Sequence, residues 1–169
     1  MSKLKLINNI LHSDFVAPNL KLEEPAASMS IDVDKRGCNA VLYKFDKLLG
    51  RDYKGGLFPF FAKNKGVCKS CDYIIFAEQN SKITVLVVEL KKGSQQTFPQ
   101  LKAAECFVKY IIDTLNRING MNLEVEIKKV SIHEIRLKKR STKPKEIVFD
   151  QMNHCIFQNN KFYISSFLN

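Results

Sequence analysis

The sequence predicts an α/β fold in which a mixed central sheet is flanked by helices, and three observations support this class. Two apolar strand patterns, at 71–79 and 82–92, are separated by the polar pair at 80–81, which is typical of a hairpin. A helical stripe of apolar residues then runs from Leu101 to Ile118, and Gly120 ends it. Another strand pattern follows at 123–137. Strands that are followed by a long helix and a further strand indicate an α/β sandwich.

The elements before the hairpin are predicted from shorter patterns. Residues 1–15 favour an amphipathic helix, and the Pro-containing stretch 17–37 favours a loop or arm that leads into the domain. Apolar residues at helical spacing predict a helix over 38–49, and 56–63 predicts a short strand. We therefore expect an N-terminal helix and arm at 1–35 and a single domain at 36–169, with further short strands in the C-terminal tail.

Length, composition and charge limit the classes of function. The chain has 169 residues, of which 45% are hydrophobic, so it contains enough apolar material for one domain with its own core. No apolar run approaches the roughly 18–20 residues of a membrane span, and we expect no membrane partner. The net charge of +10 favours a polyanionic partner, for which nucleic acid is the first candidate. Five Cys without a secretory signal pattern favour a reducing, cytoplasmic location.

Polar residues at the end of the most apolar strand are the first candidates for a functional site. Glu89 and Lys91 interrupt the apolar stretch 82–92 near its end, and side chains two residues apart on a strand share a face. A hairpin that turns at 80–81 places Asp72 opposite Glu89, so that two carboxylates become cross-strand neighbours. Two like charges at such a position repel each other unless a positive charge lies between them.

A divalent cation would satisfy this pair of carboxylates. Mg²⁺ prefers oxygen ligands and commonly uses one or two carboxylates together with water and substrate phosphate, and Mn²⁺ can take its place. A cation held there can polarise a phosphoryl oxygen, and Lys91 beside it can stabilise the charge that develops on phosphorus. These residues therefore predict metal-assisted phosphodiester hydrolysis.

The same residues carry a resemblance to a known family. An acid that opens one strand, a hairpin, and an apolar strand that ends in Glu89-Leu90-Lys91 resembles the PD-(D/E)XK nuclease superfamily, which includes restriction endonucleases and Holliday-junction resolvases. The family core, a helix, three strands, a helix and a strand, matches the predicted elements between about 36 and 137. The resemblance implies a restriction-endonuclease-like three-layer sandwich. The chain departs from the family motif in having Cys71 in place of the Pro before Asp72.

The resemblance also implies roles for individual residues. Asp72 and Glu89 would bind the metal, the carbonyl of Leu90 would complete its shell, and Lys91 would be the catalytic lysine. Family members often carry a Gln at the start of the next helix, and Gln100 is better placed for this than Gln95 or Gln96.

A further acid is common on the first helix of the family. The predicted helix at 38–49 contains no Glu, so that Asp46 or the preceding Asp34 would have to supply this ligand.

We therefore expect a Mg²⁺-dependent endonuclease, with DNA as the expected substrate, and the size of the chain allows a homodimer that would pair two sites. Basic residues near the site or in the loop after the last core strand could follow a phosphate backbone. They are Lys92, Lys102, Lys138, Lys139, Arg140 and Lys143.

Other interpretations of the same residues stay open. Glu89 and Lys91 could form a simple salt bridge at a strand tip, and the fold would then serve as a non-catalytic module that binds nucleic acid or protein. In a third interpretation the net charge of +10 serves an acidic protein partner. The Cys68–Cys71 pair is half of a zinc site, but no second pair at ligand spacing accompanies it, which favours ordinary core or strand-edge cysteines.

Overall fold

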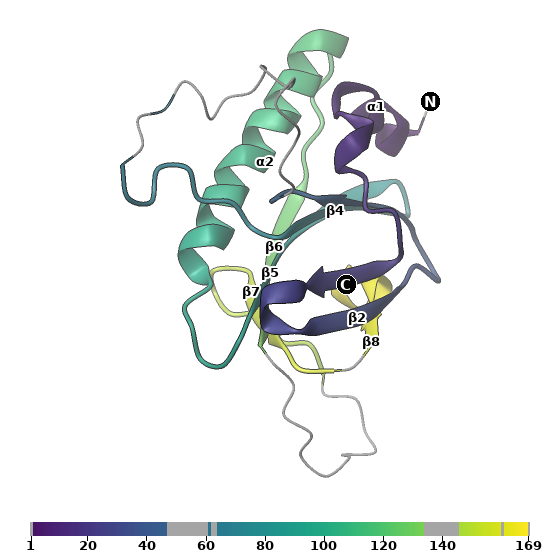
Figure 1. The fold of residues 1–169 in the computed structure, drawn as a ribbon. Helices are drawn as coiled ribbons and strands as arrows, with labels where there is room; N and C mark the ends of the chain where they lie inside the picture. Colours follow the sequence, from purple (N-terminus) through teal and green to yellow (C-terminus); the bar gives the residue numbers. More distant parts are fainter. Residues whose placement is uncertain (1, 47–60, 62–63, 134–145, 160, 169) are drawn as a thin grey trace.

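The computed structural model describes residues 2–46, 61, 64–133, 146–159 and 161–168 (Figure 1). Within these residues, two α-helices and eight strands form an α/β arrangement, together with short 3₁₀ turns. The elements are α1 (Lys3–Ile10), η1 (Ser13–Phe15), β1 (Lys21–Glu24), η2 (Pro25–Ala27), β2 (Met29–Asp34), β3 (Asn39–Lys44), β4 (Tyr73–Gln79), β5 (Lys82–Lys91), α2 (Phe98–Asn119), β6 (Glu126–His133), β7 (His154–Phe157), β8 (Lys161–Tyr163) and η4 (Ile164–Phe167).

The larger of the two sheets in the described part of the chain is mixed, as predicted. Its strand order is β3-β4-β5-β6-β7, with antiparallel pairs up to β5 and parallel pairs from β5 onward. The middle strand, β5, is buried from Ile83 to Leu90 because both of its faces are covered. The prediction that this apolar stretch is a central strand is confirmed.

The hairpin between β4 and β5 also forms in the predicted register. Asn80 and Ser81 make a two-residue turn in which both have positive φ angles, 49° and 62°, as a tight hairpin of this length requires. Tyr73 then pairs with Val88 at the other end of the hairpin. This register brings the residue before β4 to the level of Glu89.

The fold has three layers with a hydrophobic core on each face of the large sheet, but one of the outer layers differs from the prediction. α1 and α2 cover one face of the large sheet, where Val85 and Val87 of β5 point (Figure 1). The opposite face, with Leu86 and Val88, is covered by the small sheet β1-β2-β8 and by η4 rather than by a helical layer. Among the described residues, the arrangement is thus helices, mixed sheet, small sheet.

Two sequence predictions in the N-terminal part were wrong. Residues 39–44 form the edge strand β3 instead of a helix. Their apolar side chains face both cores, so the sequence lacks the period of two that marks a half-buried strand and that would have predicted one. The segment 17–37 contains β1 and β2 instead of a loop, and both strands pack on the large sheet. The division into an arm at 1–35 and a domain at 36–169 stays a prediction. The predicted strand at 56–63 lies outside the described residues except for Phe61.

The long helix α2 confirms its predicted extent. One face, which includes Leu101, Val108 and Leu115, is fully buried against β5 and β6. Gly120 caps the C-terminus in the left-handed conformation with φ of 59°, where its amide bonds the carbonyl of Asn116. No helix in the described ranges is long and apolar enough to cross a membrane.

Candidate metal-dependent active site

The hairpin places two predicted site residues at one end of the large sheet. Asp72 immediately precedes β4 and, by the register of the hairpin, lies opposite Glu89 near the end of β5. The backbone N–H of Leu90 donates a hydrogen bond of 2.6 Å to Asp72 Oδ2. The predicted proximity of Asp72 and the Glu89-Leu90-Lys91 segment is therefore present in the structure.

Glu89 and Lys91 form an ion pair on the helical face of the sheet. Lys91 Nζ lies 2.7 Å from Glu89 Oε1, and the side chain of Glu89 is almost completely buried at 2% exposure. The second oxygen, Glu89 Oε2, is buried and has no hydrogen-bond partner among the described residues. A buried carboxylate oxygen without a donor is unfavourable, so this oxygen is free to accept a ligand.

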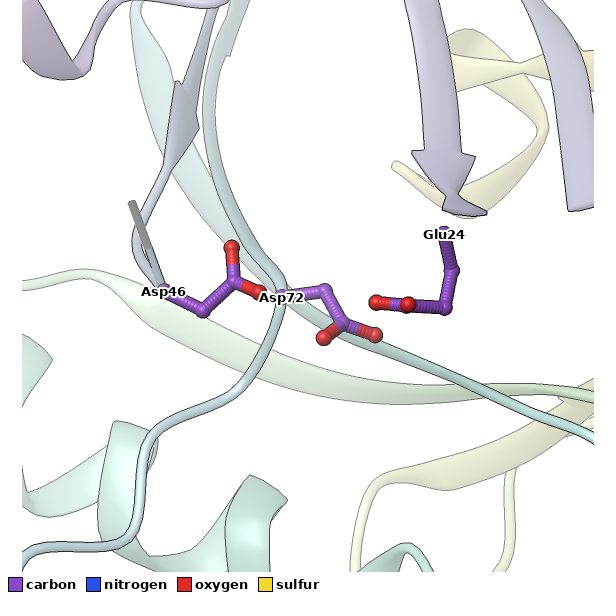
Figure 2. Close-up of side chains that lie close together, drawn as sticks. All are labelled: Glu24, Asp46 and Asp72. Atoms are coloured by element: carbon purple, nitrogen blue, oxygen red, sulfur yellow. The ribbon is translucent and has the colours of Figure 1, made fainter. Parts of the chain in front are cut away.

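Two further carboxylates converge on Asp72 from other parts of the chain. Oxygens of Glu24, Asp46 and Asp72 all lie within 4.8 Å of one another. Figure 2 shows Asp72 between the other two, with the three carboxylates turned toward one another. Glu89 is not a member of this group, and its Oε1 pairs with Lys91.

Asp46 comes to the site by the end of β3, which runs beside β4. The amide of Phe45 bonds the carbonyl of Asp72 at 2.9 Å, so Asp46 follows directly after a contact with the site. Asp34, the other candidate for the extra acid, lies elsewhere and is paired with Arg36 at 2.7 Å and Lys161 at 3.2 Å. The hydrogen bonds from Arg36 hold the pKa of Asp34 well below its usual range. Asp46, in a turn and not on a helix, is the residue that meets Asp72.

Glu24 is the site residue that the sequence analysis missed. It ends β1, and the hydroxyl of Tyr73 anchors this strand by accepting from Glu23 N at 2.9 Å and donating to Glu23 O at 3.1 Å. One carboxylate oxygen of Glu24 accepts from the amide of Ala26 at 2.9 Å and so begins η2. An acid followed directly by Pro25 was the available signal for such a cap, but only the packing of the small sheet places it beside Asp72.

The carboxylates of the site are difficult to ionise together. Burial and then the charge of Glu89 raise the pKa of Asp72 to about 7, against the opposing hydrogen bond from Leu90. Burial also raises the pKa of Glu89, although Lys91 opposes this. The pKa of Asp46 is raised by partial desolvation and by Glu24, while Lys44 opposes. Desolvation lowers the pKa of Lys91, but the hydrogen bond that Lys91 donates to Glu89 and the nearby negative charges outweigh it, so the net pKa is raised and Lys91 stays protonated.

Gln100, the fourth predicted catalytic residue, lies in the first turn of α2. Its Oε1 is buried and has no hydrogen-bond partner within the described part of the chain. The only other buried side-chain oxygen of this kind in the same residues is Glu89 Oε2. Two predicted site residues therefore carry the buried acceptors that the protein itself leaves unsatisfied, as expected of groups that receive a ligand.

A chain of hydrogen bonds anchors the start of α2 beside the site. Ser131, the register partner of Glu89 on β6, has no exposed surface, and its hydroxyl contacts both Thr97 Oγ1 and His154 Nε2, the latter at 2.7 Å. His154 Nδ1 in turn lies 3.5 Å from Asp150. The order serine, histidine, aspartate resembles a catalytic triad, but a buried serine that also bonds Thr97 is not an accessible nucleophile. The chain positions the helix that carries Gln100.

Two of the predicted basic residues, Lys92 and Lys102, lie in the part of the chain that the structure describes. Lys92 is exposed directly after β5, next to Lys91. Lys102 is exposed on α2, where its Nζ lies 5.6 Å from the centre of the Phe98 ring and 3.9 Å from Glu105 Oε2. The remaining residues of the predicted phosphate track, Lys138, Lys139, Arg140 and Lys143, lie outside the described residues.

The two cysteines of the CxxC pattern have different environments. Cys68 is exposed, whereas Cys71 is buried and its thiol donates to the carbonyl of Tyr73 at 3.2 Å. Burial and the charges of Glu89 and Asp72 raise the pKa of the Cys71 thiol well above its ordinary value. A thiol that remains protonated is a poor metal ligand, so Cys71 serves as a packing residue behind Asp72.

Comparisons of the chain with protein-family models, with curated proteins and with solved structures found no match.

The donor set fits a hard divalent cation. Asp72, Asp46 and Glu24 offer carboxylate oxygens, the ligand type of Mg²⁺ and Mn²⁺, and Glu89, opposite Asp72 in the hairpin, adds an unpartnered oxygen. A cation among these groups would remove the repulsion that raises the pKa of Asp72. The arrangement can thus hold a divalent cation next to a protonated lysine.

Proposed function

We propose that the protein is a Mg²⁺-dependent endonuclease that hydrolyses phosphodiester bonds in DNA, with a site like that of the PD-(D/E)XK nucleases. The observation that carries this proposal is the unpartnered, buried oxygen of Glu89, which lies beside converging carboxylates and on the same side chain that binds Lys91. A protein that used these residues only for stability would gain by replacing them with apolar side chains.

Asp72 and Glu89, with the carbonyl of Leu90, are the proposed metal ligands of the hairpin. Asp46 and Glu24 would complete the acidic shell from the other side of Asp72, where their oxygens already converge. The Leu90 N–H holds Asp72 in orientation at 2.6 Å, which leaves the other oxygen of Asp72 for the cation. When bound, the cation supplies Lewis-acid stabilisation of a phosphoryl oxygen.

Lys91 is the proposed catalytic amine. Its side chain is only 28% exposed, and the pair with Glu89 fixes the ammonium near the carboxylates. An ammonium in this position can hydrogen-bond a non-bridging phosphate oxygen and stabilise the charge that develops in the transition state. Gln100, with its unsatisfied oxygen, would orient the attacking water by accepting one of its protons.

The charge of the molecule supports a nucleic-acid substrate. A net charge of +10 attracts polyanions, and the exposed Lys92 and Lys102 flank the end of β5 that carries the site. The basic stretch with Lys138, Lys139, Arg140 and Lys143 would extend this contact. These residues position a phosphate backbone and do not read bases, so we propose binding with little sequence preference from them.

A non-catalytic nucleic-acid-binding module is the second candidate. The observation that favours it is the ion pair between Glu89 and Lys91, which satisfies both charges at 2.7 Å without any cation. This candidate predicts DNA binding without cleavage, and substitution of Glu89 would leave DNA affinity unchanged.

Cleavage of supercoiled plasmid in the presence of Mg²⁺ or Mn²⁺ tests the proposal. The wild-type protein should nick the plasmid, whereas Glu89→Gln and Lys91→Ala should each lose at least about a hundredfold in rate. Glu124→Gln and Lys82→Gln are matched controls, since Lys82 is exposed at the opposite end of β5 and Glu124 is exposed just before β6. Cleavage that survives both site substitutions, or binding without cleavage under either metal, would overturn the catalytic assignment.

A further inference from the structure

A groove of about 450 Å³ begins at the carboxylates and continues away from them along the edge of the large sheet. Asp46 and Tyr73 line it at the site end. Its volume falls in the range of pockets that hold small ligands, and it contains Asp46 of the carboxylate group. The proposed catalytic residues do not account for its far end.

The wall of this groove is a segment fixed on the edge strand β3. Val16 forms a bridge with Tyr43, and the amide of Ala17 donates to the carbonyl of Leu42 at 2.8 Å. Pro18 follows and completes an apolar surface, on which Val16 is 40% exposed. The main chain of 16–17 is therefore held in place, while its apolar side chains stay accessible from the groove.

Two lysines add positive charge to this groove, which Asn19, Glu23 and Asp46 also line. Lys44 ends β3, and its Nζ lies over the ring of Tyr73 at 5.9 Å, close enough to Asp46 to oppose the rise of that residue's pKa. Lys44 forms no ion pair with any described residue. Lys21, at the start of β1, has only a long contact of 3.9 Å with Asp32 on the exposed surface. Both ammonium groups can therefore bind an anionic ligand.

We propose that this groove binds the nucleotide adjacent to the scissile phosphate, with Lys44 and Lys21 on its phosphate and Val16, Ala17 and Pro18 against its sugar and base. This inference rests on the proposed function, because it assigns the carboxylates to the reacting phosphate. A polynucleotide offers this alternation of anionic and flat apolar groups. The assigned contacts, lysines on phosphate and apolar side chains on sugar and base, do not distinguish one base from another, so they position the strand without reading its sequence.

The groove is tested by DNA binding at several salt concentrations. A labelled 20-nucleotide DNA is titrated in the Lys91→Ala background with Mg²⁺, so that the substrate remains intact. Lys44→Gln and Lys21→Gln should each weaken binding about three- to tenfold and reduce the slope of log K against log salt by about 1. Lys82→Gln, the same change at the far end of β5, should alter neither quantity.

A second measurement localises the contact. Deoxythymidine 5′-monophosphate added to the wild-type protein should shift the NMR amide signals of Val16, Ala17 and Lys44. Inorganic phosphate should shift the lysine signals but not those of the apolar wall. Val16→Glu, which places a carboxylate on the exposed part of this wall, should abolish the nucleotide shifts and weaken DNA binding further.

The outcomes separate this inference from the proposed function. Metal-dependent cleavage together with DNA affinity that is unchanged in Lys44→Gln and Lys21→Gln would overturn the groove assignment and leave the endonuclease intact. Absence of cleavage, with affinity and NMR shifts that depend on the groove, would overturn the endonuclease and retain a nucleotide-binding groove. Nucleotide shifts confined to other surfaces would also overturn the groove assignment.

Discussion

Asp72→Asn should increase the stability of the metal-free protein above neutral pH, although it removes a proposed ligand. The carboxyl group is 6% exposed and lies beside three other acids, which together with burial raise its pKa to about 7. An unfolded chain gives Asp72 a pKa of about 3.8. The folded state therefore binds more protons between these values, and the free energy of unfolding falls as pH rises from about 4 to about 7.

The structure sets the size of this effect. A pKa difference of about three units corresponds to roughly 4 kcal/mol that the wild-type protein loses by pH 8. Asn is nearly isosteric and accepts the hydrogen bond from Leu90 as the protonated carboxyl does, and the stronger bond to the carboxylate is already included in the pKa of about 7. Asp72→Asn should thus be more stable than wild type by roughly 4 kcal/mol at pH 8 and by only about 1 kcal/mol at pH 4.5.

Urea unfolding followed by circular dichroism, with a chelator present and at pH values from 4.5 to 8, measures this difference. Asp113→Asn, an exposed position on α2, is the control and should follow the wild-type curve. Addition of Mn²⁺ at pH 8 should stabilise the wild-type protein and leave Asp72→Asn unchanged. The reasoning is refuted if Asp72→Asn is less stable than wild type at pH 8, or if the difference between them does not change with pH.

Three further predictions concern single residues. Glu24→Gln should weaken Mn²⁺ binding about tenfold in a calorimetric titration, because the amide retains the cap of η2 but not the charge; unchanged affinity would remove Glu24 from the site. Ser131→Ala should reduce the free energy of unfolding by about 1–3 kcal/mol, since its partners on α2 and β7 lose a buried hydrogen bond; chemical denaturation with no loss would contradict the anchoring role. Gly120→Ala should cost about 1 kcal/mol because φ is 59° there, and a thermal scan without a lowered Tm would show that the cap relaxes freely.

The hairpin at the site could be predicted because its signals are local. Apolar strands on both sides of a two-residue turn fix which residues pair, so the position of Asp72 opposite Glu89 followed from counting along the chain. The end of α2 at Gly120 followed from the same kind of short-range signal.

The other half of the site depends on packing between distant segments. The apolar side chains of β3 face two cores, so its sequence does not show the period of two of a half-buried strand. A helix was therefore predicted there, and Asp46 was assigned to that helix instead of to the turn after β3. Glu24 reaches the site only because β1 is bound to the hydroxyl of Tyr73 on the large sheet. No local pattern reports such a contact, and the small sheet as a third layer could not be predicted for the same reason.

Calorimetric titration of the protein with Mn²⁺ at pH 7 tests the central claim most directly, because the proposed endonuclease requires a divalent cation among these carboxylates. We expect saturable binding in the wild-type protein, a loss of at least about tenfold in affinity in Glu89→Gln, and unchanged affinity in the control Glu124→Gln. Absence of binding, or equal affinity in Glu89→Gln and wild type, would contradict the assignment of the unpartnered Glu89 oxygen to a metal site.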